Sequence, residues 1–314
     1  MGKPGVWVGV DVSKDQLEVA LRPSGAQFSL PNDERALRML VKRLLPLNCA
    51  RIVVEATGGY ETPLVAALQA AALPIVLVNP RWVRSFAKGF GQLAKTDQID
   101  ARVLALYAER AELKVRQLPD EQTLELRALC ARREDLLDMI VAEENRLEHA
   151  PKRLAREIQS HINYLRKGIK QLNRKIDDAV RGSELWRAKA ELLDSVPGVG
   201  PVLRGALLAW LPELGTLNRG EAAALLGIAP FNHDSGAMRG RRAIGGGRAP
   251  LRRALYCTTS AAIIWNPPLR SYYEHLIANG KVHKVAMVAT MRRLLLMLNA
   301  IIKTNTPWRS PCPV

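Results

Sequence analysis

Four acidic residues in the first hundred positions have the type and spacing that suit the binding of a divalent metal ion. Asp11 lies at the end of an apolar run, VWVGVDV, and Glu55 lies near the end of a second one, RIVVEA. Asp97 and Asp100 are three residues apart in KTDQIDA, so on a helix their carboxylates would share one face. Carboxylates that converge on one place repel each other unless a cation lies between them. Mg²⁺ would remove this repulsion, because it takes oxygen ligands and keeps positions open for phosphate oxygens, and two such ions can clamp an in-line phosphoryl displacement.

Each acid also has an ordinary structural interpretation. Asp11 could accept hydrogen bonds from the backbone of the turn that follows it. Thr96 or Asp97 could cap a helix, with Asp100 placed favourably towards the helix dipole. Glu55 is harder to explain in this way, because an acid inside an apolar strand is rarely only a solvated side chain. Spacing alone leaves the metal-binding and structural interpretations open.

A second candidate site surrounds Ser235 in the segment FNHDSGAMRG. Several arginines follow it within eighteen residues, namely Arg239, Arg241, Arg242, Arg248, Arg252 and Arg253. Such a cluster could neutralise a phosphodiester, and the serine could attack phosphorus and hold DNA covalently. A Ser-Gly pair is also typical of a plain turn. The positions of His233 and Asp234 do not define a catalytic triad.

The charge of the chain is large and unevenly distributed. The sequence has 46 Lys+Arg and 30 Asp+Glu, a formal net charge of +16. From Ser235 to the end, 13 basic residues accompany a single acidic one, Glu274. A basic field of this kind attracts polyanions, so nucleic acid is the expected partner. The alternative is a basic protein whose charge has no such partner.

The remaining composition favours a reducing, cytosol-like compartment. No stretch is predicted to span a membrane, because the most apolar run, Leu64–Val78, is broken by Gln69 and Pro74. The first residues contain no apolar secretory segment. The cysteines are scattered without a CxxC pair and are expected to be reduced thiols. They are Cys49, Cys130, Cys257 and Cys312. We therefore expect a cytoplasmic protein.

The elements that must position the acids belong to a predicted α/β domain. Strands are expected at Val6–Val12, Gln16–Arg22, Arg51–Ala56 and Pro74–Pro80, and helices at 33–45, Tyr60–Leu73, Arg81–Lys88 and Asp97–Leu113. Functional residues of such domains gather where strands end. Two neighbouring strands could therefore bring Asp11 and Glu55 together, and the helix that opens at Asp97 could point at the same crevice.

A long helix-forming region, roughly Asp120–Val180, follows and is interrupted at Pro151. Apolar residues in its second part have heptad spacing, at Ile158, Ile162, Leu165, Ile169, Leu172 and Ile176. This stripe could serve self-association as a coiled coil. The alternative is a helix that packs on its own domain.

The last segment begins near Ser183 and contains SVPGVGPVL, which is typical of a helix–hairpin–helix. In that motif the glycines, here Gly198 and Gly200, let the backbone approach a DNA phosphate. A plain connection between two helices is the alternative. Helices are expected at Glu221–Leu226, Pro250–Trp265 and Val282–Lys303, with a Gly- and Arg-rich loop, GAMRGRRAIGGGR, before the second of these.

A set of motifs occurs in order along nearly the whole chain. The motifs are GVDVSK, VVEATGGYE, KTDQIDA, PGVGP, GIAPFNHDSG and a tail that begins GRRAIGGGRAPLRRALY. As a set they resemble the "IS one-ten" class of insertion-sequence transposases, also called DEDD transposases and now regarded as RNA-guided recombinases. Members excise and insert their element without flanking duplications, and the resemblance implies a prokaryotic, cytoplasmic, nucleoid-associated protein.

The resemblance implies a RuvC-like domain of the ribonuclease-H type at residues 1–118. Its DEDD acids map onto Asp11, Glu55, Asp97 and Asp100 and bind Mg²⁺. Long helices or a coiled coil follow at 119–182, and a mainly α transposase domain at 183–314 supplies the nucleophile, Ser235. The resemblance further implies a structured guide RNA encoded by the element, which pairs with target and donor DNA. It also implies a composite active site, in which acids of one subunit meet the serine of another in a dimer of dimers.

The residues predict metal-dependent phosphodiester chemistry on nucleic acid, with contacts from Gly198, Gly200 and the arginines after Ser235. The resemblance implies that this chemistry is site-specific DNA recombination. One alternative is a RuvC-like nuclease or junction resolvase, in which a metal-activated water is the nucleophile and the serine is structural. The other is a non-catalytic nucleic-acid-binding protein, in which the acids serve as caps and turn residues. Composition and spacing do not themselves point to the RNA.

Overall fold

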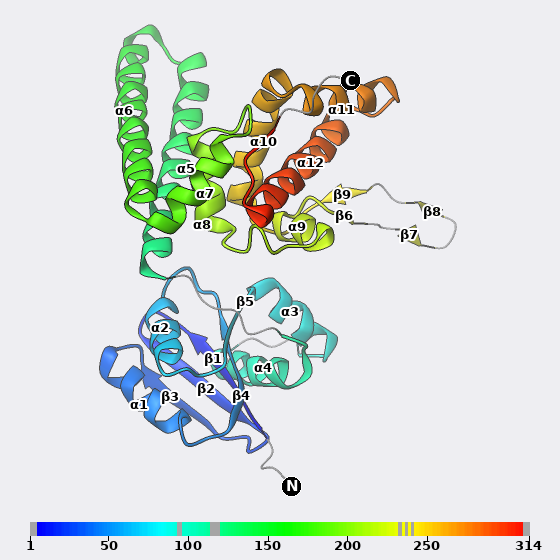
Figure 1. Cartoon of the computed structure of the whole chain (residues 1–314). Helices are drawn as coiled ribbons and strands as arrows, with labels where there is room; N and C mark the ends of the chain where they lie inside the picture. Colours follow the sequence, from blue (N-terminus) through cyan, green and yellow to red (C-terminus); the bar gives the residue numbers. More distant parts are fainter. Residues whose placement is uncertain are drawn as a thin grey trace. The chain divides into compact units, whose positions relative to one another are not determined.

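The computed structural model describes residues 5–92, 96–113, 120–231 and 242–309, together with the backbone of 234–235 and 238–239. The chain divides into two compact units, Met1–Leu118 and Pro119–Val314 (Figure 1). Each unit has its own core and is described by itself.

The first unit is built on a five-stranded mixed sheet in the order β3-β2-β1-β4-β5. The strands are β1 (Val6–Val12), β2 (Gln16–Arg22), β3 (Gln27–Pro31), β4 (Cys49–Glu55) and β5 (Ile75–Val78). β2 is antiparallel to β1 and β3, whereas β1, β4 and β5 run parallel. The predicted α/β class is confirmed. The edge strand β3 was not predicted, because its alternately exposed residues, QFSLP, lack a strongly apolar face.

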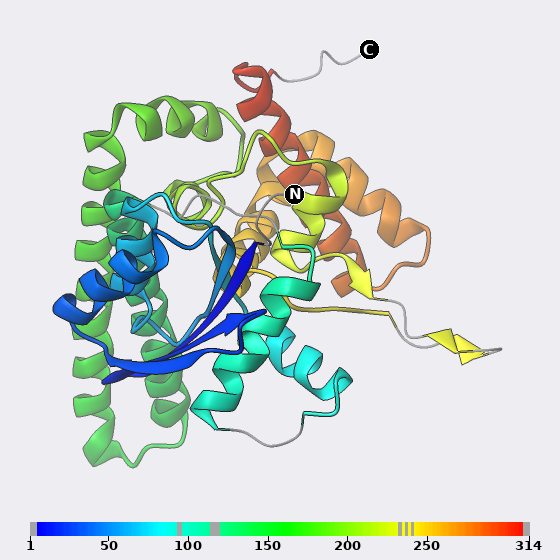
Figure 2. The ribbon, with the colours of Figure 1, turned by 90° about the horizontal axis from the view of Figure 1, so that it is seen from below.

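Helices cover both faces of this sheet (Figure 2). On one face lie α1 (Glu34–Leu44) and α2 (Thr62–Ala70), and on the other lie α3 (Pro80–Gly89) and α4 (Asp97–Arg110). The strands serve both cores by alternation, since Ile52 and Val54 face the first pair of helices and Val53 faces the second.

The second unit begins with a helical hairpin of α5 (Glu121–Glu148) and α6 (Lys152–Gly182), with Pro151 as the N-cap of α6. Ile162 and Leu165 of the heptad stripe are buried against Leu136 and Ile140 of α5. The stripe is thus occupied by packing within the chain, which favours the intramolecular alternative over self-association through these residues.

The remaining helices pack around one apolar core. They are α7 (Glu184–Asp194), α8 (Pro201–Trp210), α9 (Arg219–Leu226), α10 (Ala249–Trp265), α11 (Pro267–Ala278) and α12 (His283–Thr304). The sequence did not predict α11, which starts directly after α10 at an Asn266 cap and the pair Pro267-Pro268. α12 is long and apolar enough to cross a bilayer by length and composition, which the sequence inspection missed. Its residues Leu294, Leu295 and Leu298 are fully buried in the core, which accounts for this composition.

The Gly- and Arg-rich segment contains paired strands, so the prediction of an irregular loop was wrong there. β6 (Pro230–Phe231) pairs with β9 (Ala243–Ile244), and β7 (Asp234–Ser235) pairs with β8 (Met238–Arg239), both antiparallel. The two pairs form a ribbon that extends away from α9 (Figure 1).

Candidate active site

Asp11 and Glu55 occupy corresponding positions on the neighbouring parallel strands β1 and β4. Val10 of β1 pairs with Val54 of β4, so the next residue of each strand is an acid. Val10 and Val54 are buried on the side of α1 and α2. Because side chains alternate along a strand, both acids face the opposite side of the sheet, where α4 lies. The predicted meeting of the two strand-end acids is therefore supported by the register.

The helix α4 is fixed over this face by a close approach to Gly9. A Cβ atom added to Gly9 would lie 2.2 Å from the backbone nitrogen of Ala105 and 2.4 Å from the carbonyl oxygen of Ala101. Only glycine allows the strand and helix backbones to come so close. The side chains of Ala101 and Ala105 are themselves small and buried, which completes the contact.

The other end of α4 is anchored by two arginines. Arg51 of β4 donates to the carbonyl oxygens of Ala108 and Ala111, at 3.0 and 2.6 Å. These carbonyl groups lie at the helix C-terminus, where a cation is favourable. Arg22 of β2 forms an ion pair of 2.7 Å with Glu109. With both ends held, the direction of the helix start is fixed.

That helix start carries the second pair of acids. Thr96 is the N-cap, since its hydroxyl accepts a hydrogen bond from the Ile99 N–H at 3.3 Å. Asp97 and Asp100 follow in the first turn, where negative charge is favourable to the helix dipole. The cap is therefore supplied by the threonine, and the structural interpretation of Asp97 as a cap is not needed.

The electrostatics of Asp11 place the four acids in one neighbourhood. Burial raises the pKa of Asp11, and the charges of Asp100, Asp97 and Glu55 raise it further, to about 6, while the N–H of Val12 acts in the opposite direction. Burial is the largest cause of this shift in pKa, and the neighbouring negative charges add to it. The negative charges of the other three sequence-predicted acids therefore act on Asp11.

The four acids fit a hard divalent cation in their chemistry, since they offer carboxylate oxygens and a local excess of negative charge. Within the described part of the chain, no group of three or more His, Cys, Asp or Glu side chains is already arranged to hold a metal ion. The local negative charge thus fits a divalent cation, whereas the described side chains do not form a ready-made coordination site.

The turn after Asp11 is closed by Ser13. The Ser13 hydroxyl accepts from the N–H of Gln16 at 3.1 Å and donates to its carbonyl oxygen at 3.0 Å. Asn32 then joins this turn to the loop after β4, because its side-chain amide donates to the carbonyl oxygens of Ser13 and Tyr60, at 2.9 and 3.3 Å. The local turn contacts belong to these residues, which weakens the interpretation of Asp11 as a turn residue.

The loop after Glu55 is organised by Glu61, a residue that the sequence inspection did not single out. Its carboxylate accepts from the N–H and hydroxyl of Thr57, at 3.1 and 3.0 Å, and from the N–H of Gly59 at 2.8 Å. Burial by itself raises the pKa of Glu61, but these hydrogen bonds outweigh it and hold the pKa below its usual value. Gly58 and Gly59 have positive φ, so the letters TGG already signalled a folded loop.

The serine site is described only in part. Ser235 and Arg239 lie in the paired strands β7 and β8, of which the structure describes the backbone alone. Arg241 lies outside the described residues. Arg242, which precedes β9, is exposed.

The other three predicted nucleic-acid arginines have partners within the second unit. Arg248 forms two hydrogen bonds with Glu213, at 2.8 and 2.7 Å. Arg252 donates to the carbonyl oxygens of Leu226 and Gly246. These contacts give both side chains a structural role.

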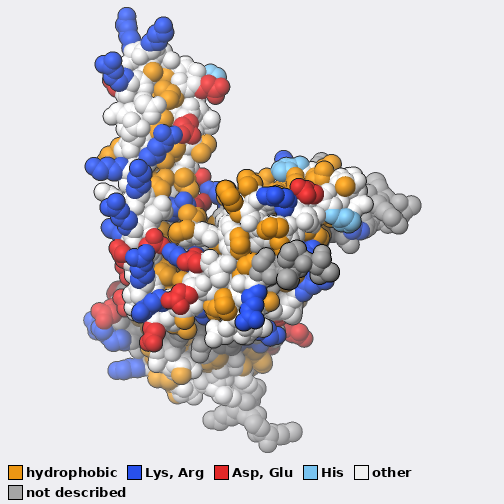
Figure 3. Space-filling model, turned by 45° about the horizontal axis from the view of Figure 1, so that its top comes forward, with side chains coloured by type: hydrophobic (Ala, Val, Ile, Leu, Met, Phe, Trp, Pro, Cys, Tyr) orange, Lys and Arg blue, Asp and Glu red, His pale blue; other side chains and the backbone are white. Residues whose placement is uncertain are grey.

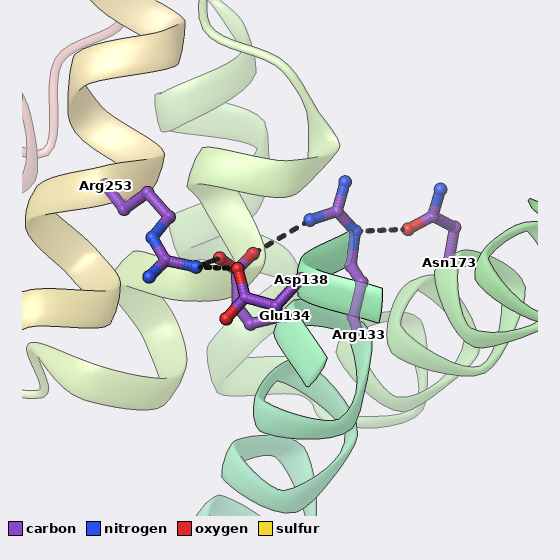
Figure 4. A network of polar contacts seen from close by, with 5 residues as sticks. All are labelled: Arg133, Glu134, Asp138, Asn173 and Arg253. Atoms are coloured by element: carbon purple, nitrogen blue, oxygen red, sulfur yellow. Dashed lines mark hydrogen bonds and ion pairs between the residues drawn. The ribbon is translucent and has the colours of Figure 1, made fainter. Parts of the chain in front are cut away.

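Arg253 of α10 joins the hairpin. It pairs with Asp138 at 2.8 Å and with Glu134 at 3.5 Å, both on α5, while Arg133 donates to Asn173 of α6 at 2.8 Å (Figure 4). The network ties α10, α5 and α6 together. The side chain of Arg253 is still 56% exposed, so its structural pairing leaves much of it facing solvent.

The PGVGP connection joins α7 to α8 and contains a glycine with a packing role. Gly198 has φ 88°, and a Cβ atom there would lie 2.5 Å from the Cα atom of Ala262 in α10. Gly200 is the N-cap of α8, and a Cβ atom added there would meet nothing within 4 Å. The need for glycine at position 198 is thus explained inside the fold, whereas Gly200 is sterically open.

The helix α6 of the hairpin is also rich in positive charge, which the sequence inspection did not single out. α6 contains nine Lys and Arg against three Asp and Glu, whereas α5 contains four against eight. Figure 3 shows Lys and Arg side chains spread along this hairpin. The two long helices are therefore of opposite charge, and α6 extends the basic surface of the second unit.

Two family models match most of the chain. One, described as a transposase of the DEDD type of IS110, matches residues 8–155 and so contains all four acids. The other, described as the transposase IS116/IS110/IS902 family, matches residues 190–274 and contains the predicted serine and the arginines.

Several relatives match over nearly their whole length. Pilin gene-inverting proteins of Moraxella lacunata and Moraxella bovis are each 26% identical over 312 residues, which cover 96% of this chain and 97% of theirs. The insertion element IS116 44.8 kDa protein of Streptomyces clavuligerus is 25% identical over 393 aligned positions, with 98% of this chain and 97% of that protein covered.

Proposed function

Since this chain belongs to the IS116/IS110/IS902 family of transposases, we propose that it excises an insertion sequence from DNA and inserts it at another site. The observation that carries the proposal is the register that makes Asp11 and Glu55 neighbours, together with the negative charges of Asp97 and Asp100 that act on Asp11. Transposase or recombinase activity follows from the family. The Moraxella relatives are named for gene inversion, which is a site-specific recombination, and this supports strand exchange at defined sites.

The fold of the first unit supports a RuvC-like, ribonuclease-H-type domain. Three antiparallel strands continue into parallel strands in the order β3-β2-β1-β4-β5, with helices on both faces. The acids come from the first strand, the fourth strand and the start of a helix that crosses the sheet. This is the arrangement that the resemblance implies for the DEDD acids.

Asp11, Glu55, Asp97 and Asp100 would hold Mg²⁺. When bound, the ion supplies Lewis-acid stabilisation of a phosphodiester undergoing displacement. The protein's own contribution is positioning. Gly9 and Arg51 hold α4 against the sheet, and Glu61 holds the loop beyond Glu55, so the carboxylates occupy fixed places before DNA arrives.

Ser235 is the proposed nucleophile. Its oxygen would attack phosphorus to form a phosphoserine ester with one DNA end, while the sugar oxygen of the other end leaves and takes up a proton. The basic residues near the ribbon would neutralise the charge that develops on phosphate. Following the resemblance, the serine of one subunit would meet the acids of another in a dimer of dimers, and a structured RNA would select the DNA.

Denaturing gels test this function directly. The protein would be mixed with Mg²⁺, DNA carrying the element's ends and the RNA transcribed from the element. A covalent protein–DNA adduct is expected from the wild type and not from Ser235→Ala or Asp100→Asn. Free cleaved ends with an unimpaired Ser235→Ala protein would indicate a RuvC-like nuclease that uses water. Omitting the RNA should abolish the adduct if the DNA is chosen by RNA.

A further inference from the structure

An open groove lies between α3 and α4 in the first unit. It has a volume of about 310 Å³, at the lower end of the range for small-molecule sites, and therefore suits a small planar group. Its walls combine an aromatic side and a polar side. The residues that matter here are Phe86, Phe90, Gln92, Ile99, Arg102 and Arg22.

The aromatic wall is a ladder of three rings that leads from the core to solvent. Tyr107 is 8% exposed and meets Phe86 edge-on, with ring centroids 4.9 Å apart. Phe86 in turn meets Phe90 at 4.6 Å. Phe90 ends the ladder with a ring that is 60% exposed. A large apolar ring fixed from behind and open in front is a platform for a flat ligand.

The rim of the groove carries positive charge. Arg102 is exposed on α4 and lines the groove. Arg22 also lines it and is held in place by its ion pair with Glu109. An aromatic face beside arginine groups is the combination that binds single-stranded nucleic acid, in which bases stack on rings and phosphates pair with cations.

The groove and the acids share the start of α4. Asp97 and Asp100 lie in its first turn, and Ile99 and Arg102, which line the groove, lie in the same two turns. At 3.6 residues per turn, Asp97 and Ala101 lie on the sheet side and Ile99 and Arg102 on the opposite side. A helix with side chains is about 10–12 Å across, and phosphates of one duplex strand are about 3.4 Å apart along the axis. A strand at the acids can therefore reach the groove within a few nucleotides.

We propose that the groove between α3 and α4 binds an unpaired base of the DNA strand whose phosphate lies at the four acids. The base stacks on Phe90, and Arg102 pairs with an adjoining phosphate. The inference rests on the proposed function for the presence of that strand, and it adds a site that removes a base from the duplex beside the cleavage point.

Photocrosslinking tests the proposal without requiring cleavage. The full chain would be irradiated with a single-stranded oligodeoxynucleotide that carries 5-iododeoxyuridine, and the crosslinked peptides would be mapped by mass spectrometry. A crosslink in the peptide that contains Phe90 is expected, in the wild type and equally in Asp100→Asn. If the crosslink were lost in Asp100→Asn alone, the loss would be due to the acids and not to the groove. The proposed groove and the proposed function can therefore fail separately.

Matched variants in and next to the groove sharpen the test. Phe90→Leu keeps an apolar side chain but removes the ring, and should lose the crosslink and weaken binding of the oligonucleotide about tenfold. Trp82→Leu removes another ring of α3, 69% exposed and outside the groove, and should change neither. Arg102→Gln should lower the slope of log affinity against log salt by about 0.7.

Equal crosslinking by wild type and Phe90→Leu would overturn the proposal, as would a map with no crosslink in the peptide that contains Phe90. Crosslinking of the matching oligoribonucleotide alone would overturn the assignment to DNA.

Discussion

Gly9 of β1 lies against Ala101 of α4 so closely that a Cβ atom at position 9 would be 2.4 Å from the Ala101 carbonyl oxygen. Asp11 is two residues further along the same strand and therefore on the same face. Asp100 is the residue before Ala101. The distance between strand and helix at this contact thus sets the distance between two acids of the candidate site, although neither Gly9 nor Ala101 has chemistry of its own.

Gly9→Ala should separate α4 from the sheet and spread the acids. The added methyl group cannot fit without a backbone shift, so we expect a loss of about 1–3 kcal/mol in stability. Recombination should fall much further than stability. Denaturant unfolding and the adduct assay would measure the two effects. Gly89→Ala is the control, since its Cβ would meet nothing within 4 Å. A Gly9→Ala protein with normal activity would show that this contact does not position the acids.

Asp11→Asn should stabilise the metal-free protein at high pH. The pKa of Asp11 is raised to about 6 from 3.8, so the folded chain binds the proton more tightly than the unfolded chain. Stability therefore falls as the pH rises through this window, and above it the charged carboxylate costs of the order of 2 kcal/mol after allowance for solvent screening. In EDTA the melting temperature of Asp11→Asn should be higher than that of the wild type at pH 8 and equal to it at pH 4. A lower melting point at pH 8 would contradict the repulsion.

Mg²⁺ should stabilise the wild type more at high pH than at low pH, which is the opposite of the pH dependence expected for the metal-free protein. The ion needs the charged carboxylates, so it should raise the melting temperature at pH 8 and much less at pH 5, where protons compete. Asp11→Asn and Asp100→Asn should both lose this shift. Chelation should return the wild type to its metal-free melting point. An equal Mg²⁺ shift in all three proteins would mean that the ion binds elsewhere.

Arg242→Gln and Arg248→Gln should separate nucleic-acid binding from stability. Arg242 is exposed, so its loss should reduce the salt slope of duplex binding by about 0.9 and leave melting unchanged. Arg248 forms two hydrogen bonds with Glu213, so its loss should lower stability, by about 1–3 kcal/mol. Titrations at several salt concentrations and thermal melts would measure both. The reverse pattern would contradict the structural role of Arg248.

Leu165→Ala should destabilise the hairpin without changing its oligomeric state. Leu165 is 4% exposed and packs on α5, so its truncation should cost about 2–5 kcal/mol. Leu154→Ala, on the same helix but 49% exposed, should cost about 0.5 kcal/mol or less. Calorimetry and sedimentation would follow the two variants. Dissociation of an assembly by Leu165→Ala at unchanged stability would instead support the coiled-coil alternative.

Local patterns were strong predictors where an element has a continuous apolar face. The strands that carry Asp11 and Glu55 and the helix that begins at Asp97 were predicted close to their observed bounds. β3 and the paired strands around Ser235 were missed, because short or half-exposed strands owe their existence to their neighbours. α11 was missed because Asn266 and two prolines read as a break, whereas they start a helix.

The sequence by itself determined which residues have the chemistry. It showed four acids near the ends of predicted elements, a basic C-terminal quarter and the motifs of the family, because residue types and local periodicity are properties of the chain alone. Only the tertiary structure decided that Gly9 and Arg51 place α4, that Glu61 folds the loop beyond Glu55, and that Arg248 and Arg253 are held by acids. Apart from the contacts of Glu61 within its own loop, those roles depend on contacts between segments far apart in the sequence. The register and packing distances that create such contacts exist only after folding.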